Sequence, residues 1–183
     1  ILLPTDGSKR YDYDKSAAEW KLTHLVHFPD GLKEKVFALF EEMKKNPEFD
    51  FPAEVFGDVI EDRQTQITIS ALGQKAPVDK KAAWDPDQAK RKKMREFMIQ
   101  ALPEADILIG GMTSLDILPK GFNKAVGLES MLSVLGMTRD DMEYVGDAIF
   151  PGGNDYSVVE DGIAALKVAN PMETAKLIKE WIG

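Results

Sequence analysis

The stretch over residues 145–156 constrains the fold of this 183-residue chain more than any other. A short apolar strand ends directly in Gly146 and Asp147, and a glycine-rich loop then leads to Asn154 and Asp155. In open α/β sheets, ligands bind beyond the carboxyl ends of the strands. Two carboxylates held there by a tight loop suit a hard cation such as Mg²⁺. By spacing alone, an acidic surface turn explains the same residues about equally well.

Two alternation patterns divide the chain into an α+β part and an α/β part. Over residues 66–70, polar and apolar positions alternate as in a half-buried antiparallel strand, and residues 107–109 and 113–117 look like two strands joined at Gly110-Gly111. Helical periodicity surrounds these strands. Beyond Pro119, helices alternate with short apolar strands, which is typical of an α/β fold. We therefore expect an α+β domain with an antiparallel sheet over residues 1–119 and an α/β domain over residues 120–183.

The α/β part contains too few strands to form a sheet alone. We predict only two strands in it, near residues 142–145 and 164–168. Two parallel strands cannot make a sheet that is covered on both faces. The chain also begins at Ile1, inside an apolar stretch, rather than at Met. We therefore expect further strands to precede Ile1 in the intact protein.

Composition excludes several classes of partner. The formal net charge is -8, which disfavours nucleic acids and anionic membranes. No cysteine is present, so disulfides and thiolate chemistry are excluded, and a cytoplasmic location fits. A phosphorylated substrate is also an anion, so its site would need local cations, backbone amides or a metal ion.

Four motifs together resemble one enzyme family. The pattern Gly-Asp-x-x-x-Pro-Gly-Gly-Asn-Asp-Tyr over residues 146–156 is similar to the fourth motif of haloacid dehalogenase phosphatases with a type IIB cap. Its Pro-Gly-Gly-Asn-Asp version resembles eukaryotic-type phosphomannomutases. Residues 117–124 resemble that family's Pro-x-Gly-Trp-x-Lys segment, residues 112–116 its strand with Ser-x-Asp, and residues 60–63 its arginine-bearing cap hairpin. The matches run in the family's order to the end of the chain.

The resemblance implies an enzyme that uses Mg²⁺ to transfer a phosphoryl group from a phosphosugar. Asp147 and Asp155 would bind the metal, and Asp147 would be the more direct ligand and a catalytic residue. Asn154 would orient the phosphoryl group. Lys124 would neutralise charge on the transferring oxygens, with Lys120 as the second candidate.

The resemblance also implies substrate-binding residues in the cap. Arg63 would hold the distal phosphate of the substrate with its planar guanidinium fork. Ser114 and Asp116 are two positions apart on a strand, so they face the same side and would contact a sugar hydroxyl and a phosphate edge. Family members often dimerise through the cap, and the resemblance implies a homodimer of this kind.

Some residues depart from the family pattern. Gln74 and Lys81 stand where phosphomannomutases have further arginines, and Thr68 stands where they have an asparagine. Lysine attracts a phosphate but cannot grip it as a planar fork. A mutase must hold either phosphate of its intermediate equally well. The cap has fewer arginines for a second phosphate, which favours a phosphosugar phosphatase, with a phosphomannomutase or other hexose-phosphate mutase as the alternative.

The nucleophile of the superfamily, the first Asp of Asp-x-Asp-Gly-Thr, has no match in the chain. The nearest pattern, over residues 3–8, has Pro4 in the place of the nucleophile. We interpret Asp6 as a turn residue in a hairpin over residues 1–13. An aspartyl-phosphate would therefore form on a residue upstream of Ile1. If no such residue exists, the chain would be a non-catalytic fragment that binds phosphosugars.

Overall fold

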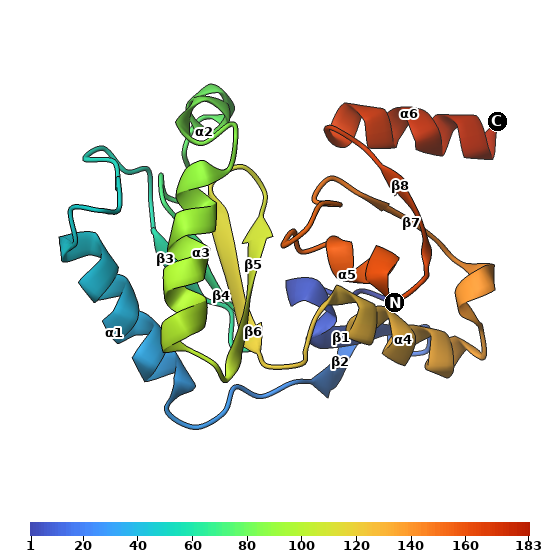
Figure 1. The fold of residues 1–183 in the computed structure, drawn as a ribbon. Coiled ribbons are helices and arrows are strands. Elements are labelled where there is room, and N and C mark those ends of the chain that lie inside the picture. Colours follow the sequence, from blue (N-terminus) through green and yellow to red (C-terminus); the bar gives the residue numbers. More distant parts are fainter.

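The computed structural model describes all residues from 1 to 183, which form two packing units side by side (Figure 1). We call residues 26–119 the cap unit and residues 1–25 with 120–183 the core unit. The cap unit is an antiparallel sheet with helices, and the core unit contains a parallel strand pair with helices. The observed class is therefore the predicted one, an α/β core with an α+β cap.

The cap sheet has four strands, in the spatial order β3-β4-β6-β5, and every neighbouring pair is antiparallel. Its strands are β3 (Ile60–Asp62), β4 (Ile67–Ser70), β5 (Ala105–Gly110) and β6 (Ser114–Pro119). Thr68 pairs with Asp116 and Ser70 pairs with Ser114. Because side chains alternate between the faces of a sheet, these four residues share one polar face.

The opposite face of the cap sheet carries the main apolar core. Its helices are α1 (Leu32–Lys45), α2 (Val78–Trp84) and α3 (Ala89–Ala101). Helices α1 and α3 supply Phe40, Met43 and Met98 to a cluster of 16 buried apolar residues that also contains Ile67 and Ile117. The alternation predicted over residues 66–70 is confirmed, because Ile67 and Ile69 point into this cluster. The strand is not half-buried as predicted, because Thr68 and Ser70 on its other face are also buried.

The core unit is built around two parallel strands, β7 and β8. Helices precede and follow these strands, as the predicted alternation requires. In chain order the elements are α4 (Lys124–Leu135), η2 (Arg139–Asp141), β7 (Glu143–Gly146), α5 (Tyr156–Glu160), β8 (Ala164–Lys167) and α6 (Pro171–Ile182). Its apolar cluster has only three buried residues, Leu128, Val158 and Ile163. None of the helices in either unit combines the length and apolar character that crossing a membrane requires.

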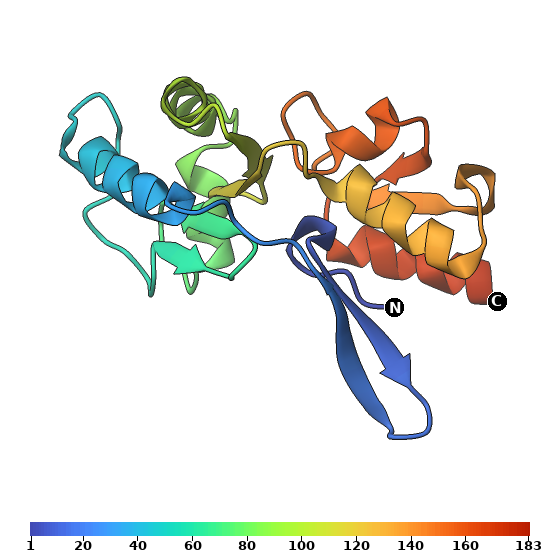
Figure 2. The same ribbon diagram turned by 90° about the horizontal axis from the view of Figure 1, so that it is seen from below.

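The first 25 residues lie against the core unit. A short turn, η1 (Thr5–Gly7), precedes the strands β1 (Lys9–Asp14) and β2 (Glu19–Leu25), whose hairpin projects away from both units (Figure 2). We expected one hairpin over residues 1–13; only a single bridge, between Leu2 and Tyr11, forms there. The main ladder instead joins β1 to the seven residues of β2, so the hairpin turn lies at residues 15–18.

A close backbone approach holds η1 against α4. A Cβ atom on Gly7 would lie 2.7 Å from the Cα atom of Gly127, so only glycine fits at this crossing. We therefore propose that residues 1–25 belong to the core unit rather than to the cap, and that the boundary between the two units lies near residue 119.

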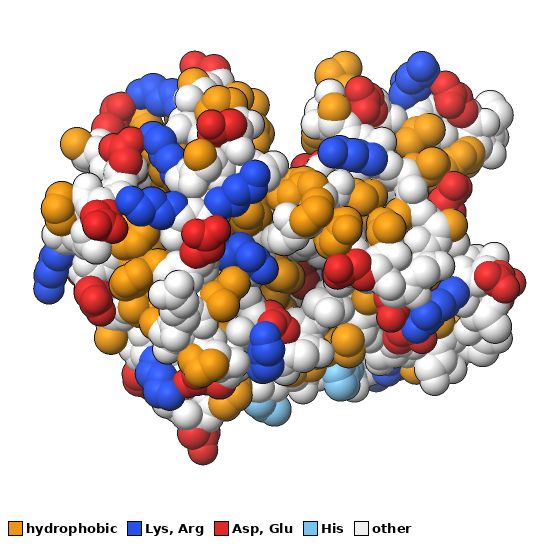
Figure 3. Space-filling model, in the orientation of Figure 1, with side chains coloured by type: hydrophobic (Ala, Val, Ile, Leu, Met, Phe, Trp, Pro, Cys, Tyr) orange, Lys and Arg blue, Asp and Glu red, His pale blue; other side chains and the backbone are white.

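The two units also touch through their backbones, next to a cleft (Figure 3). The amide of Ile109 in β5 donates to the carbonyl of Gly152 at 2.9 Å, and the amide of Asn154 donates back to Ile109 at 3.1 Å. The end of the cap sheet is thus joined directly to the glycine-rich loop of the core unit.

Candidate active site

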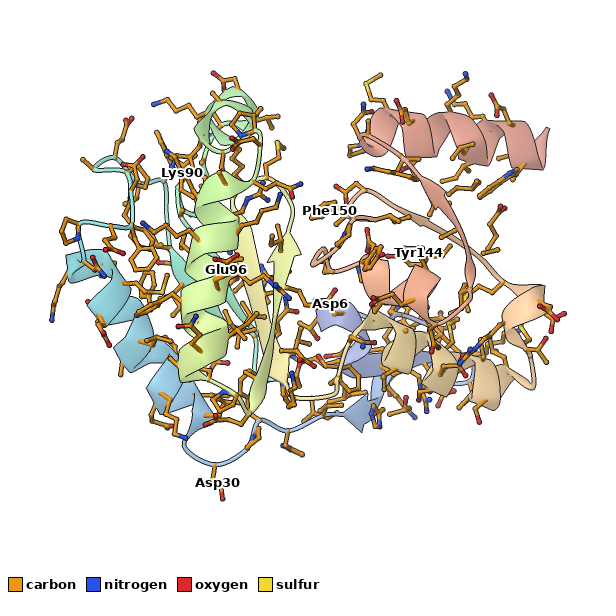
Figure 4. All side chains as sticks on the ribbon, in the orientation of Figure 1. Asp6, Asp30, Lys90, Glu96, Tyr144 and Phe150 are labelled. Atoms are coloured by element: carbon orange, nitrogen blue, oxygen red, sulfur yellow. The ribbon has the colours of Figure 1, made fainter.

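Lys124 lies at the centre of a buried charged cluster, on the first turn of α4. Asn123 begins this helix, and its side chain accepts a hydrogen bond from the amide of Val126. The ammonium of Lys124 contacts Asp155 Oδ1 directly and lies 3.3 Å from Asp6 Oδ1. Figure 4 places Asp6 between the strands of the cap unit and helices α4 and α5.

Asp155 is held by three donors from the core unit. Besides Lys124, the hydroxyl of Tyr144 donates to Oδ1 at 2.6 Å, and the amide of Ala148 donates to Oδ2 at 2.9 Å. A Cβ atom on Gly146 would lie 2.3 Å from Asp155 Oδ2. The glycine at the end of β7 therefore leaves the space into which this carboxylate fits.

The cluster shifts the pKa values of its members in opposite directions. Burial works against the ionised forms of Lys124 and Asp155. The charges of Asp6 and Asp155 nevertheless raise the pKa of Lys124, and the charge of Lys124 lowers the pKa of Asp155, so both stay charged. Burial raises the pKa of Asp6 to about 6, although the nearby ammonium opposes this. Burial and Asp155 raise the pKa of the Tyr144 hydroxyl, which stays a hydrogen-bond donor.

Asn154 links the charged cluster to the cap unit. Its side-chain amide lies 3.4 Å from Asp6 Oδ1, and its backbone amide pairs with Ile109. A Cβ atom on Gly110 would lie 2.4 Å from Asp116 Oδ2 and 3.8 Å from the side-chain nitrogen of Asn154. The amide of the core loop and the carboxylate of the cap sheet therefore converge on the same glycine.

The polar face of the cap sheet presents a buried carboxylate and several hydroxyl groups. Thr68 donates to Asp116 Oδ1 at 2.8 Å, and the hydroxyls of Ser70 and Ser114 are 2.9 Å apart. Burial raises the pKa of Asp116, while Thr68 and the charge of Lys124 oppose the rise. Because Lys124 acts on this carboxyl as well, the cap face and the charged cluster belong to one electrostatic environment.

Arg63, the predicted phosphate-binding residue, is engaged by a neighbour. Its Nε and Nη2 atoms donate to Glu61 Oε2 at 2.9 Å and 2.6 Å. Both side chains are about two-fifths exposed, so the pair lies at the margin of the site. Arg63 still acts electrostatically on Asp116, whose pKa it lowers.

Asp147 is exposed and makes no hydrogen bond or ion pair in the structure. It lines a cavity of about 390 Å³ together with Lys124, Tyr144 and Asp155. It also lines a second cavity of about 330 Å³, opposite Lys81 and other cap residues. Its free carboxylate therefore lies where the core cavity meets the cleft.

The residues present fit a Mg²⁺ ion whose coordination shell is supplied partly by the protein and partly by water and substrate. No group of three or more acidic or histidine side chains converges in the structure. Mg²⁺ commonly uses one or two carboxylates and completes its shell with waters and phosphate oxygens. Asp147 has a free carboxylate for this purpose. Asp155 already accepts three hydrogen bonds, so it is better placed to position its neighbours than to surround an ion.

The structure thus brings together most of the predicted site residues. Lys124 contacts Asp155, Asn154 is linked to Lys124 through Asp6, and Asp116 approaches from the cap. Asp147 shares a cavity with Lys124. Ser114 lies two residues from Asp116 on the same face of β6. The runner-up Lys120 instead pairs with Asp106 at 2.7 Å on an exposed surface.

Two residues of the cluster were missed by sequence reasoning. The interpretation of Asp6 as a turn residue was incomplete: it lies in η1 with a left-handed φ of 53°, but its buried side chain also faces Lys124. Tyr144 reads as an ordinary strand residue. The available signal for Asp6 was the pattern over residues 3–8, in which Asp6 stands at the second Asp of Asp-x-Asp-Gly-Thr.

Comparisons with known proteins show which family the chain belongs to. A family model described as eukaryotic phosphomannomutase matches residues 6–182. The chain belongs to this family. The phosphomannomutase of Spinacia oleracea is 26% identical over 189 residues, covering 92% of this chain and 72% of that protein. The phosphomannomutase of Schizosaccharomyces pombe is 30% identical over 131 residues, covering 68% of this chain and 49% of that protein.

The phosphomannomutase family assignment agrees with the fold. A structure of N-terminal truncated, IMP-bound Plasmodium falciparum IMP-nucleotidase superimposes with a TM-score of 0.58 at 17% identity, covering 94% of this chain and 45% of that one. At this identity the likeness shows the fold alone. The chain spans about half the length of that protein and of most curated phosphomannomutases that it matches. The predicted resemblance to phosphomannomutase is confirmed.

Proposed function

We propose that the intact protein is a Mg²⁺-dependent phosphosugar phosphatase. One observation carries this proposal: Lys124 lies between the carboxylates of Asp155 and Asp6 and shares a cavity with the free carboxylate of Asp147. A fixed ammonium beside a free carboxylate is what an anionic phosphoryl group and its metal ion require.

Each core residue would have a distinct task. Lys124 would hold a positive charge against the phosphoryl oxygens, and Asp155 with Tyr144 would fix the position of that ammonium. Asp147 would hold the ion, and Mg²⁺ when bound would supply further neutralisation of the phosphoryl charge. Asn154, which lies between Asp6 and the cap, would orient the phosphoryl group.

Attack on phosphorus needs a nucleophile that the cluster does not offer. Asp155 accepts three hydrogen bonds, and Asp6 faces Lys124 and Asn154. We propose that a carboxylate outside residues 1–183 attacks phosphorus and releases the sugar hydroxyl. Water would then cleave the aspartyl-phosphate and release inorganic phosphate. A homodimer through the cap and a cytoplasmic location are further parts of this proposal.

A mutase is the second candidate, and the family match favours it. A mutase returns the phosphoryl group to a sugar before water attacks, so its cap must bind a second phosphate. In this chain the guanidinium of Arg63 is already paired with Glu61. That pairing is why we place hydrolysis first.

The two reactions are separated by assaying the full-length protein with Mg²⁺. Phosphate release from a set of hexose phosphates is measured beside interconversion of hexose 1- and 6-phosphates. Hydrolysis predicts net phosphate release that is lost with Asp147→Asn. Interconversion without net release would replace the phosphatase with the mutase, and neither reaction would refute both.

A further inference from the structure

Strand β5 lies at the edge of the cap sheet, next to the core unit (Figure 1). Only one side of this strand pairs with β6, so the backbone groups on its other side need different partners. The carbonyl of Ile107 accepts a hydrogen bond from Arg95 Nε at 2.6 Å. At Ile109, the amide donates to Gly152 and the carbonyl accepts from Asn154, which together form a parallel bridge. The core loop therefore extends the cap sheet by one short strand.

Phe150 attaches this loop to the cap by apolar packing. Although Phe150 belongs to the core unit, its side chain packs against the main apolar cluster of the cap and not against the small cluster of the core. Figure 4 places it between the two units. A Cβ atom on Gly153 would lie 3.1 Å from ring atom Cε2 of Phe150 and 2.1 Å from the carbonyl oxygen of Ala148. Glycine at position 153 therefore lets the loop fold tightly against the ring.

Arg95 reaches the same junction from helix α3. Besides donating to Ile107, its guanidinium carbon lies 3.5 Å from the position that a Cβ atom on Gly152 would take. Gly152 has a left-handed φ of 85°, which glycine adopts without strain. One arginine thus contacts both the edge strand of the cap and the loop that extends it.

The loop held at this junction carries much of the chemistry of the site. Residues 147–155 connect β7 to α5 and include Asp147, Asn154 and Asp155. Asp155 is fixed within the core unit by Lys124 and two further donors. The side chain of Asn154 has only one hydrogen bond, to Asp6 Oδ1, and that bond is 3.4 Å long. The position of Asn154 therefore depends mainly on its backbone, which is bonded to the cap.

We propose that Phe150 and Arg95 are positioning residues that hold the loop of residues 147–155 on the edge of β5. Neither side chain bonds to the charged cluster, so both act through the loop backbone, whose bridge to Ile109 fixes the place of Asn154. The effect of this anchor on phosphoryl transfer rests on the proposed function, whereas the anchor itself does not. A displaced orienting group slows a reaction more than it weakens binding of the substrate.

The first test measures amide hydrogen exchange of the full-length protein by mass spectrometry, for Phe150→Leu beside Phe51→Leu. Both phenylalanines are partly buried loop residues that pack against the same apolar cluster, but Phe51 lies between α1 and β3. Relative to peptides of β4, Phe150→Leu should speed exchange in peptides that contain Ile109 and Asn154 about two- to tenfold. Phe51→Leu should leave this ratio unchanged. Equal ratios in the two variants would overturn the inference.

Steady-state kinetics of the same two variants test the effect on the reaction. With Mg²⁺ and glucose 6-phosphate, Phe150→Leu should lower kcat about two- to tenfold and change KM by less than about twofold. Phe51→Leu should leave both constants unchanged. A purely structural role would give the two variants the same constants, and that result would overturn the positioning role. If the unmodified protein releases no phosphate, the proposed function fails, and hydrogen exchange still decides whether the loop is anchored.

The third test compares Arg95→Met with Lys92→Met. Both changes remove one positive charge from α3, but Lys92 is exposed on this helix. Arg95→Met removes the donor to Ile107, so exchange in peptides that contain Ile109 should become about two- to tenfold faster. Lys92→Met should change it by less than about twofold. Equal exchange in the two variants would overturn the role of Arg95.

Discussion

The cap unit and the core unit bury different kinds of side chain. The cap unit encloses 16 apolar residues behind its sheet, whereas the core unit encloses three and leaves Met172 and Ile182 of α6 largely exposed. The core unit instead holds the charged cluster around Lys124. Stability should therefore depend mainly on the cap sheet, and phosphoryl chemistry mainly on the core unit.

The largest expected effect concerns one buried ion pair of the cap. Arg91 Nε lies 2.8 Å from Asp85 Oδ2, and the two side chains are 4% and 0% exposed. Arg91→Met would leave Asp85 buried and unpaired, which should cost roughly 3–5 kcal/mol of unfolding free energy. Urea unfolding of the purified variant measures this loss.

The matched control lies in the core unit. Arg139 pairs with Glu129 and Asp161, but its side chain is about half exposed. Arg139→Met should therefore cost less than about 1 kcal/mol. Equal losses for the two arginine variants would remove the contrast between the units.

A smaller effect is expected from the pH dependence of stability. The folded state raises the pKa of Asp6 from 3.8 to about 6, mainly through burial, so it binds this proton more tightly than the unfolded chain does. The contribution of Asp6 to stability is thus complete below about pH 4 and is lost as the pH rises through about 6. Asp6→Asn should remove roughly 1–3 kcal/mol of the change in unfolding free energy between these pH values.

Unfolding free energies measured between about pH 4 and pH 7 test this expectation. The control is Asp30→Asn, since Asp30 points into solvent away from the cluster (Figure 4). An unchanged slope in the Asp6 variant would mean that its carboxyl does not carry the shift.

The smallest effect is expected at Tyr144, whose hydroxyl donates to Asp155 at 2.6 Å. Tyr144→Phe removes one hydrogen bond but keeps the ring, so unfolding free energy should fall by about 0.5–1.5 kcal/mol. Because Asp155 then holds Lys124 less firmly, kcat should fall about two- to tenfold. Tyr13→Phe on the exposed hairpin should change neither quantity, and matching losses at both positions would contradict a positioning role.

Local patterns predicted what local forces determine. The two-residue spacing of Ser114 and Asp116 on β6 placed them on one face of the sheet, where the structure has them. The class of the two domains also followed from periodicity, because hydrophobic spacing directly reflects which face is buried.

Contacts between distant segments were not predictable in this way. Asp6 meets Lys124 only because η1 crosses α4 at Gly7 and Gly127, and no local propensity encodes that crossing. The pairing of Ile109 with Gly152 likewise depends on how the two units dock. Sequence reasoning therefore identified the parts of the site, while their junction required the structure.

The most direct test of the account is the steady-state kcat of full-length Lys124→Met, measured beside Lys120→Met. Lys124 begins α4 and Lys120 lies four residues before it, but Lys120 is paired with Asp106 outside the cluster. Loss of the Lys124 charge should lower kcat for phosphate release about 10²- to 10³-fold, whereas the Lys120 variant stays within about twofold. Activity of Lys124→Met within about tenfold of the unmodified protein would contradict the account.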